Sequence, residues 1–201
     1  MIRRIPSILA WSKLTLRKPR DLTCPTRRNI LRGAACGLLG GFPIAKALAT
    51  PAPRLPRTLS FRHTHTGEAL STCYFDGSTY VPGALGQLNH LMRDFRNDAV
   101  MDMDAGLFDL LWDLRAAADR DATFEIISAY RSPATNAMLH RRSSGVAEHS
   151  QHLLGKAIDI RIRGFSTSRL AELARGLKRG GVGYYARSDF VHVDTGRVRY
   201  W

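Results

Sequence analysis

Two short segments that lie far apart in the sequence restrict how this chain can fold more than any other feature. Residues 150–159, Ser-Gln-His-Leu-Leu-Gly-Lys-Ala-Ile-Asp, contain His152 and Asp159, and residues 189–194, Asp-Phe-Val-His-Val-Asp, contain His192. Two neutral imidazoles and one carboxylate are a sufficient set of protein ligands for a zinc ion that keeps its fourth position open for water. The sequence therefore predicts a fold that brings both segments around one metal ion, as in a metallohydrolase.

The local pattern indicates how these side chains would be presented. On a strand over residues 190–194, alternate side chains share a face, so His192 and Asp194 point the same way. Asp159 is expected on a neighbouring strand, and His152 on the loop before that strand, where Gly155 permits a tight turn. His192 and Asp194 also match the start of an iron(II) facial triad. That triad usually needs a further histidine downstream, and none follows Asp194.

Two other side chains are candidates for acting on a substrate. Asp189 directly precedes the strand of His192, and a carboxylate above the open metal position can accept a proton from metal-activated water. Arg131 follows the short β-rich run 123–130, so its guanidinium is expected to be held in place, and its fixed fork of donors suits a carboxylate or a developing oxyanion. For Arg131 taken alone, the alternative is a structural role; for Asp189, the alternative is a metal ligand.

The positive charge of the chain is concentrated near its N-terminus. Residues 1–49 hold 10 Lys and Arg and one acid, whereas residues 50–201 hold 20 Lys and Arg and 16 acids. The second part is therefore near +4 (20 minus 16), and it has no run of like charge typical of a nucleic-acid-binding arm. We expect no nucleic-acid partner, and no pattern indicates the oligomeric state.

The basic N-terminal part has the features of an export signal. Thr-Arg-Arg-Asn-Ile-Leu at residues 26–31 matches the twin-arginine pattern, and the apolar run 33–42 is too short to span a bilayer. Ala47 and Ala49 offer the small residues that a signal peptidase needs. We expect residues 1–49 to be a signal peptide, removed on export to the periplasm without leaving a stable membrane anchor. The alternative is a basic arm with a chance pair of arginines.

Hydrophobic periodicity in the remainder predicts one α+β domain over residues 57–201, behind a proline-containing linker at 50–56. Its helices are expected to pack on a small, mostly antiparallel sheet. His63 and His65 fall in the predicted hairpin, where nothing nearby completes a metal site, and we expect them at the surface. The predicted elements are a hairpin over 59–75, helices over 84–95 and 133–142, and strands over 123–130, 157–162, 182–185, 190–194 and 197–201. Two more helices are expected, one capped among residues 102–104 and extending to 118, the other capped by Ser166 or Thr167 and extending through 178.

These residues also carry a family resemblance. The 150–159 motif, preceded by Ser-Ala-Tyr-Arg-Ser-Pro at 128–133 and followed by a short strand with one histidine, resembles the zinc peptidases of the LAS group. That group includes D-Ala-D-Ala peptidases and the hedgehog signalling domain. From Arg-Thr-Leu-Ser-Phe at 57–61 to His-Val-Asp-Thr-Gly-Arg-Val-Arg-Tyr-Trp at 192–201, the chain more closely resembles the exported murein endopeptidases of the MepK type.

The resemblance implies a zinc-dependent enzyme that cuts the peptide cross-links of peptidoglycan. It implies Zn²⁺ bound by His152, Asp159 and His192. It also implies Asp189 as the general base, where several relatives have Glu, and Arg131 as the oxyanion stabiliser. Ser150 matches a family serine expected to give hydrogen-bonding support to the site. The bond cut within the cross-link is not indicated.

A binding module is the alternative to an enzyme. A protein can keep this fold and its metal and only bind cell-wall peptides, as the hedgehog domain illustrates. The sequence feature that favours an enzyme is the carboxylate of Asp189. Incubation with cross-linked muropeptides separates the two functions, because only an enzyme converts dimers to monomers.

Overall fold

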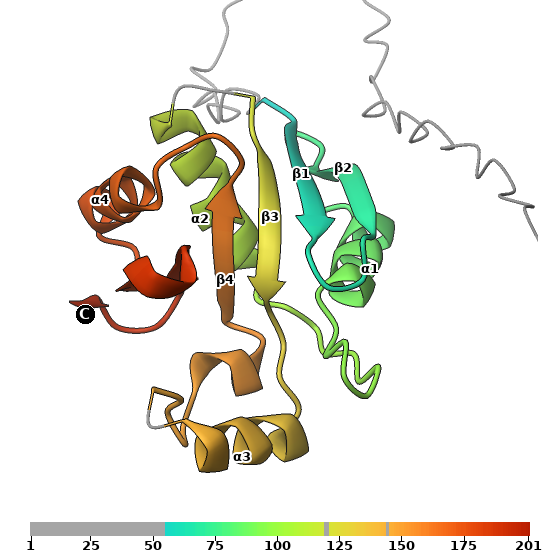
Figure 1. Cartoon of the computed structure of the whole chain (residues 1–201). Helices are drawn as coiled ribbons and strands as arrows, with labels where there is room; N and C mark the ends of the chain where they lie inside the picture. The colour runs from blue at the N-terminus through green and yellow to red at the C-terminus, as the bar shows by residue number, and fades with distance from the viewer. Residues whose placement is uncertain (1–54, 119–120, 144) are drawn as a thin grey trace, which may run out of the picture.

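The computed structural model describes residues 55–118, 121–143 and 145–201 (Figure 1). The predicted signal peptide, residues 1–49, and most of the predicted linker lie outside the described residues. Within them, no helix is both long and apolar enough to cross a membrane.

One mixed sheet organises the described part of the chain. Its strand order is β2-β1-β3-β4-β6-β5-β7. Neighbouring strands are antiparallel except at the β1–β3 and β5–β7 pairs, which are parallel. The predicted α+β class and the mostly antiparallel sheet are therefore confirmed. The strands are β1 (Arg57–His63), β2 (Ala69–Phe75), β3 (Thr123–Ser128), β4 (Ala157–Ile162), β5 (Gly181–Tyr185), β6 (Phe190–Asp194) and β7 (Arg199–Tyr200).

The helices begin where the sequence supplies capping side chains. The Asp104 carboxylate accepts a hydrogen bond from the Gly106 N–H before α2, and the Ser132 and Ser166 hydroxyls cap α3 and α4 in the same way. The helices are α1 (Pro82–Leu91), α2 (Ala105–Ala117), α3 (Pro133–Arg142) and α4 (Thr167–Leu177), with short 3₁₀ turns η1 (Gln151–Leu154) and η2 (Ala186–Ser188).

The first helix differs from its prediction over 84–95. It begins at Pro82, whose fixed φ suits a first helical turn. It ends at Leu91, and the chain then turns around the fully buried carboxylate of Asp94. That carboxylate accepts hydrogen bonds from the backbone N–H groups of Arg96 and Ser132. These bonds compete with continuation of the helix, which a hydrophobic pattern alone does not reveal.

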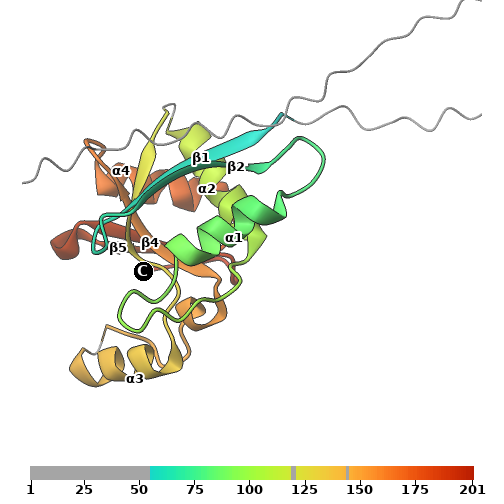
Figure 2. The ribbon, with the colours of Figure 1, turned by 90° about the vertical axis from the view of Figure 1, so that its right-hand side faces the viewer.

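The alternation of side chains along the central strands separates the core from the candidate site. Helices α2 and α4 cover one face of the sheet, and α2 passes behind β3 and β4 in Figure 1. On β4, Ile158, Ile160 and Ile162 are buried on that face. Asp159 and Arg161 therefore face the opposite side, as does His192 on β6. The second view shows α3 set beyond one end of the sheet (Figure 2).

The expected surface position of His63 is wrong. Its side chain is 1% exposed and packs edge-on against Phe95. Its Nδ1 atom accepts hydrogen bonds from the backbone N–H groups of His65 and Thr66, and so shapes the β1–β2 turn. Burial, with smaller contributions from neighbouring cationic groups, lowers the pKa of His63. The residue occupies a core-facing position of β1, because Leu59, Phe61 and His63 alternate toward the helices.

Candidate metal centre

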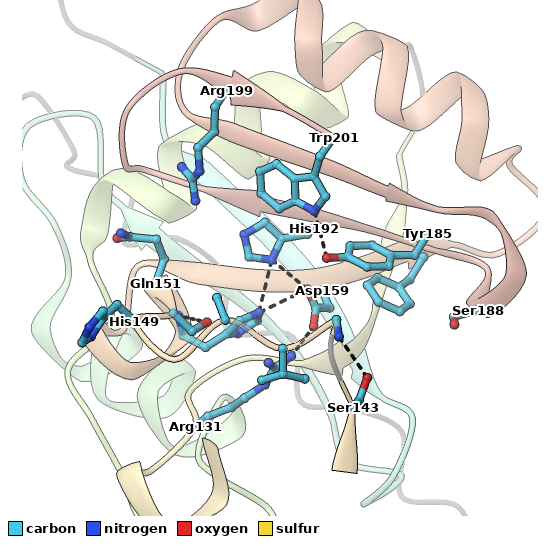
Figure 3. A pocket seen from close by; sticks show the side chains of 16 residues that line it. Arg131, Ser143, His149, Gln151, Asp159, Tyr185, Ser188, His192, Arg199 and Trp201 are labelled. Atoms are coloured by element: carbon cyan, nitrogen blue, oxygen red, sulfur yellow. Dashed lines mark hydrogen bonds and ion pairs between the residues drawn. The ribbon is translucent and has the colours of Figure 1, made fainter. Parts of the chain in front are cut away.

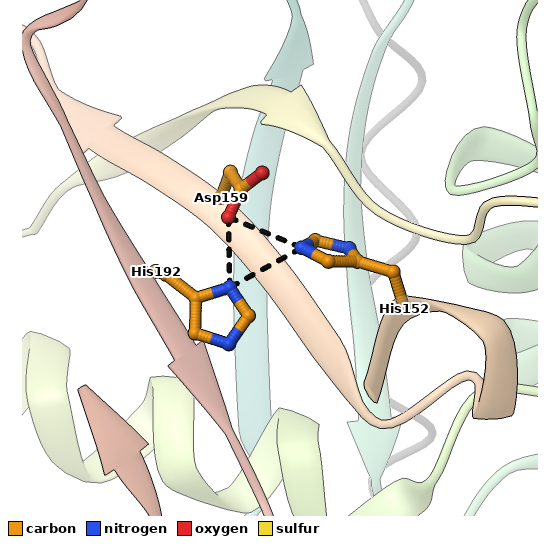
Figure 4. A group of neighbouring side chains, drawn as sticks. All are labelled: His152, Asp159 and His192. Atoms are coloured by element: carbon orange, nitrogen blue, oxygen red, sulfur yellow. Dashed lines mark hydrogen bonds and ion pairs between the residues drawn. The ribbon is translucent and has the colours of Figure 1, made fainter. Parts of the chain in front are cut away.

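The structure brings His152, Asp159 and His192 together, as the two sequence segments predict (Figure 4). His152 Nε2 lies 3.2 Å from Asp159 Oδ1 and 3.2 Å from His192 Nδ1, and the last two atoms are 2.9 Å apart. All three side chains are buried. Asp159 and His192 are register partners on the adjacent strands β4 and β6, which fixes their backbone separation.

The geometry of these three atoms fits a tetrahedral metal ion. Ligand atoms placed 2.0–2.1 Å from a tetrahedral zinc ion are separated by roughly 3.3 Å. The separations in the structure, 2.9–3.2 Å, are only slightly shorter. Two imidazole nitrogens and one carboxylate oxygen are also the donor types that zinc accepts at open sites. The residues present therefore fit a divalent metal of this kind.

His152 is oriented by the loop that carries it. Its Nδ1 atom lies 2.5 Å from the carbonyl oxygen of Ala129, so an Nδ1–H donates there and Nε2 is left as the metal-facing atom. The Ser150 hydroxyl accepts a hydrogen bond from the His152 backbone N–H, at the start of η1. Gly155 ends η1 with φ +66°, and a Cβ there would lie 2.8 Å from the carbonyl oxygen of Asp102. Only glycine fits this turn without displacing the backbone.

His192 is oriented by Asp194, whose role the sequence reasoning missed. The His192 Nε2 atom lies 2.9 Å from Asp194 Oδ2, which leaves Nδ1 to face the metal position. Asp194 is fully buried, and it also accepts hydrogen bonds from Arg199 and from the backbone N–H groups of Gly181 and Gly196. The shared strand face of His192 and Asp194 was the available signal. That pattern places the Asp194 carboxylate beside His192. In the structure the carboxylate contacts the imidazole of His192 and not the metal position.

Arg131 holds the remaining ligand. Its Nη2 atom donates to Asp159 Oδ2 at 2.6 Å, and its Nε donates to the hydroxyl of Ser128 at 2.9 Å. Asp159 therefore uses one oxygen for Arg131 and turns the other toward the histidines. Each of the three candidate ligands thus has its outer polar atom fixed by a partner, which is typical of protein metal sites.

The charges around the site favour the metal-binding protonation states of His152 and Asp159, but they favour a proton on His192. Burial lowers the pKa of His152 despite the opposing effect of Asp159, so this imidazole is kept neutral. Burial alone would raise the pKa of Asp159, but the nearby His152 and His192 hold it well below its usual range. For His192, hydrogen bonds to Asp159 and Asp194 outweigh the effect of burial and raise the pKa. A metal ion would therefore compete with a proton for the Nδ1 of His192.

The structure does not bring Asp189 to this site. The residue lies in the left-handed region with φ 51°, in the turn between η2 and β6. Its Oδ1 accepts a hydrogen bond from the Thr167 hydroxyl at 2.9 Å, and its Oδ2 lies 3.5 Å from an Arg161 nitrogen. The carboxylate lines a neighbouring cavity instead. Asp189 does lie in a turn just before the strand, as predicted, but its carboxylate contacts Thr167 and Arg161.

A cavity of about 450 Å³ opens over the metal position (Figure 3). Trp201, Tyr185 and Phe190 form an aromatic wall on one side, with the indole N–H donating to the Tyr185 hydroxyl at 2.9 Å. The Trp201 ring packs over Gly183, where a Cβ would come within 2.5 Å of the ring. Arg131 lies across the cavity. The arrangement offers an apolar wall and a cationic group to an extended, polar ligand.

Comparison with known proteins identifies the family of the chain. A family model described as peptidoglycan L,D-endopeptidase MepK matches residues 51–201. The peptidoglycan L,D-endopeptidase MepK of Escherichia coli K12 is 43% identical over 175 residues, covering 87% of this chain and 96% of that protein. The probable peptidoglycan L,D-endopeptidase MepK of Haemophilus influenzae is 44% identical over 155 residues, covering 77% and 82% respectively.

No solved structure gives a significant match to the chain. The range of the family model includes all of the described residues, among them the candidate ligands, Arg131 and the aromatic wall. The chain belongs to the MepK family of peptidoglycan L,D-endopeptidases.

Proposed function

We propose that this protein is a zinc-dependent endopeptidase that hydrolyses peptide cross-links of peptidoglycan. The observation that carries the proposal is the convergence of His152 Nε2, Asp159 Oδ1 and His192 Nδ1, with the outer atom of every ligand held by a partner. The relatives are named L,D-endopeptidases, so we propose a cross-link between an L centre and a D centre as the scissile bond.

We assign metal binding to three of the site residues and stabilisation of the substrate oxygen to Arg131. His152, Asp159 and His192 would hold the metal, which supplies a Lewis acid that polarises the peptide carbonyl and makes water more acidic. Arg131 keeps Asp159 in place through Nη2, and its Nη1 is not used in the bonds to Asp159 and Ser128. That nitrogen is available to stabilise negative charge on the substrate carbonyl oxygen. Removing such a donor typically costs about 2.7–4 kcal/mol of transition-state stabilisation.

We also propose that the protein works in the periplasm and reaches it by the twin-arginine route. The support is the arginine pair at 27–28 with its apolar run, together with the cell-wall substrate in the names of the relatives. A twin-arginine substrate crosses the membrane already folded, which suits a domain that acquires its metal first. Export that persists when both arginines are replaced by lysine would contradict this route.

One observation favours a binding module as the second candidate function. Among the described residues, Asp159 is the one acidic side chain that lines the cavity over the metal position, and Arg131 and the histidines engage it. Asp189, the predicted proton acceptor, is held in the neighbouring cavity. A metal site without a nearby carboxylate base could bind cell-wall peptides and leave them uncut.

The test incubates the purified protein with muropeptide dimers, with and without a chelator, and identifies the products by mass. An endopeptidase converts dimers to monomers, and both the chelator and the substitution His192→Ala abolish the conversion. A matched control is Asp113→Asn, which changes a surface ion pair with Arg179 and should leave conversion intact. Retention on sacculi without any cleavage by the zinc-loaded protein would establish the binding module instead.

A further inference from the structure

A second cavity lies beside the metal centre on the same face of the sheet. Its volume is about 530 Å³, and it is lined by Arg62 on β1, Glu125 on β3 and Arg161 on β4. These three residues are register partners across adjacent strands. Arg161 is two residues from Asp159 on β4, so the two side chains share a face and are separated by about 7 Å along the strand. The second cavity is therefore one row of side chains away from the metal centre.

Three arginines and two acids line this cavity, and both acids contact the same arginine, Arg161. Arg161 donates from Nε to Glu125 at 2.7 Å, and Asp189 lies on its other side at 3.5 Å. Arg62 and Arg163 also line the cavity, both exposed, and neither forms an ion pair with another described residue. The two acids are thus engaged by Arg161 and the Thr167 hydroxyl. Two guanidinium groups remain available to a ligand.

We propose that this cavity, which we call the arginine groove (Arg62, Arg161 and Arg163 with Glu125 and Asp189), binds a free carboxylate of the peptide substrate. Guanidinium groups recognise carboxylates through paired, charge-assisted hydrogen bonds. Stem peptides of peptidoglycan carry free carboxylates on their glutamate and diaminopimelate residues. The inference rests on the proposed function, because it takes the peptide at the metal centre to continue into the groove.

The proposal assigns Asp189 a role that its contacts support. With Glu125 it brackets the guanidinium of Arg161, and it is itself fixed by Thr167. Asp189 is then a positioning residue for the groove. A substrate whose free carboxylate reaches past Arg161 to Arg62 and Arg163 would meet both the metal and the groove. The groove would therefore select acidic peptides and leave the chemical step to the metal centre.

The test compares two probes on the purified protein. One is the muropeptide dimer with its carboxylates free, and the other is the same dimer with those carboxylates converted to amides. The variant is the double substitution Arg62→Gln with Arg163→Gln. The matched control is the double substitution Arg115→Gln with Arg169→Gln, which removes two positive charges from surface pairs with Asp121 and Glu172, outside both cavities.

We expect the double variant to raise KM for the free dimer about tenfold, a loss typical of one charge-assisted contact, with kcat within about twofold of wild type. On the amidated dimer, variant and wild type should have equal KM. An unchanged KM for the free dimer would overturn the proposal, as would an equal loss on both dimers.

A binding measurement separates this inference from the proposed function. Affinities of both dimers are measured by calorimetry in a His192→Ala background, which does not require turnover. If the wild-type protein cleaves neither dimer, the proposed function fails. A free dimer that binds about tenfold more tightly than the amidated one, with the preference abolished by the double variant, would still establish the groove. Equal affinities for the two dimers would refute it.

Discussion

Asp194→Asn tests whether the partner of a ligand sets the affinity of the metal centre. In the structure, Asp194 Oδ2 faces His192 Nε2 and Arg199, while Oδ1 receives the backbone N–H groups of Gly181 and Gly196 and a second Arg199 nitrogen. Every partner of the Asp194 carboxylate is an N–H donor. An asparagine has only one acceptor oxygen, so whichever way its amide is turned, its NH₂ group faces N–H groups that have lost their acceptor. The least crowded choice places that NH₂ opposite His192.

That orientation changes the tautomer of His192. An NH₂ group opposite Nε2 favours a ring with its proton on Nδ1, the atom that faces Asp159 and the metal position. Loss of such a partner typically weakens metal binding 10–100-fold, which corresponds to about 1.4–2.7 kcal/mol. Asp194 is fully buried, so water cannot replace the lost acceptor. We expect the zinc affinity to fall within this range.

The assay is a zinc competition titration against a chromophoric chelator at fixed pH. Asp113→Asn is the matched control, because it removes the same charge from a side chain that is 41% exposed and pairs with Arg179 at the surface. The control should keep wild-type affinity. An Asp194→Asn protein whose zinc affinity lies within twofold of the control would refute the argument that Asp194 orients His192.

Three further outcomes are expected. The Asp189→Asn protein should keep its metal and most of its kcat, because the Asp189 carboxylate lies in the arginine groove. A loss of several orders of magnitude in kcat would show that Asp189 is the general base. Gly155→Ala should lower the free energy of unfolding, measured in urea, by about 1–2 kcal/mol more than Gly164→Ala. Both glycines have positive φ, but only at Gly155 would a Cβ lie 2.8 Å from a backbone oxygen. Equal losses for the two variants would contradict this. Burial lowers the pKa of His63, so the unfolded chain binds more protons as the pH falls below about 6.5, and the free energy of unfolding decreases. His63→Gln should flatten that decrease between pH 7 and pH 5, and equal slopes would show that His63 does not contribute.

The sequence predicted the parts of the fold that depend on local patterns. The alternation of Ile158, Asp159 and Ile160 is enough to distinguish the core face of β4 from its site face. The capping residues expected among 102–104 and at Ser166 or Thr167 lie directly before α2 and α4, and in the structure Asp104 and Ser166 are the caps. These features depend on neighbouring residues, and a single sequence records them directly.

The parts that the sequence did not predict depend on contacts between distant segments. The parallel pairing of β1 with β3 brings Arg62 beside Glu125, and no local pattern specifies it. The buried position of His63 follows from packing against Phe95. Asp189 has a left-handed backbone, which is uncommon for residues other than glycine and was not expected at this position.

The proposed function requires His152, Asp159 and His192 to bind one divalent metal ion. The most direct measurement is a crystal structure of the zinc-loaded protein with anomalous data collected at the zinc absorption edge. We expect a single strong anomalous peak about 2.0–2.2 Å from His152 Nε2, Asp159 Oδ1 and His192 Nδ1. The absence of a peak among these three atoms, or zinc bound only elsewhere on the chain, would contradict it.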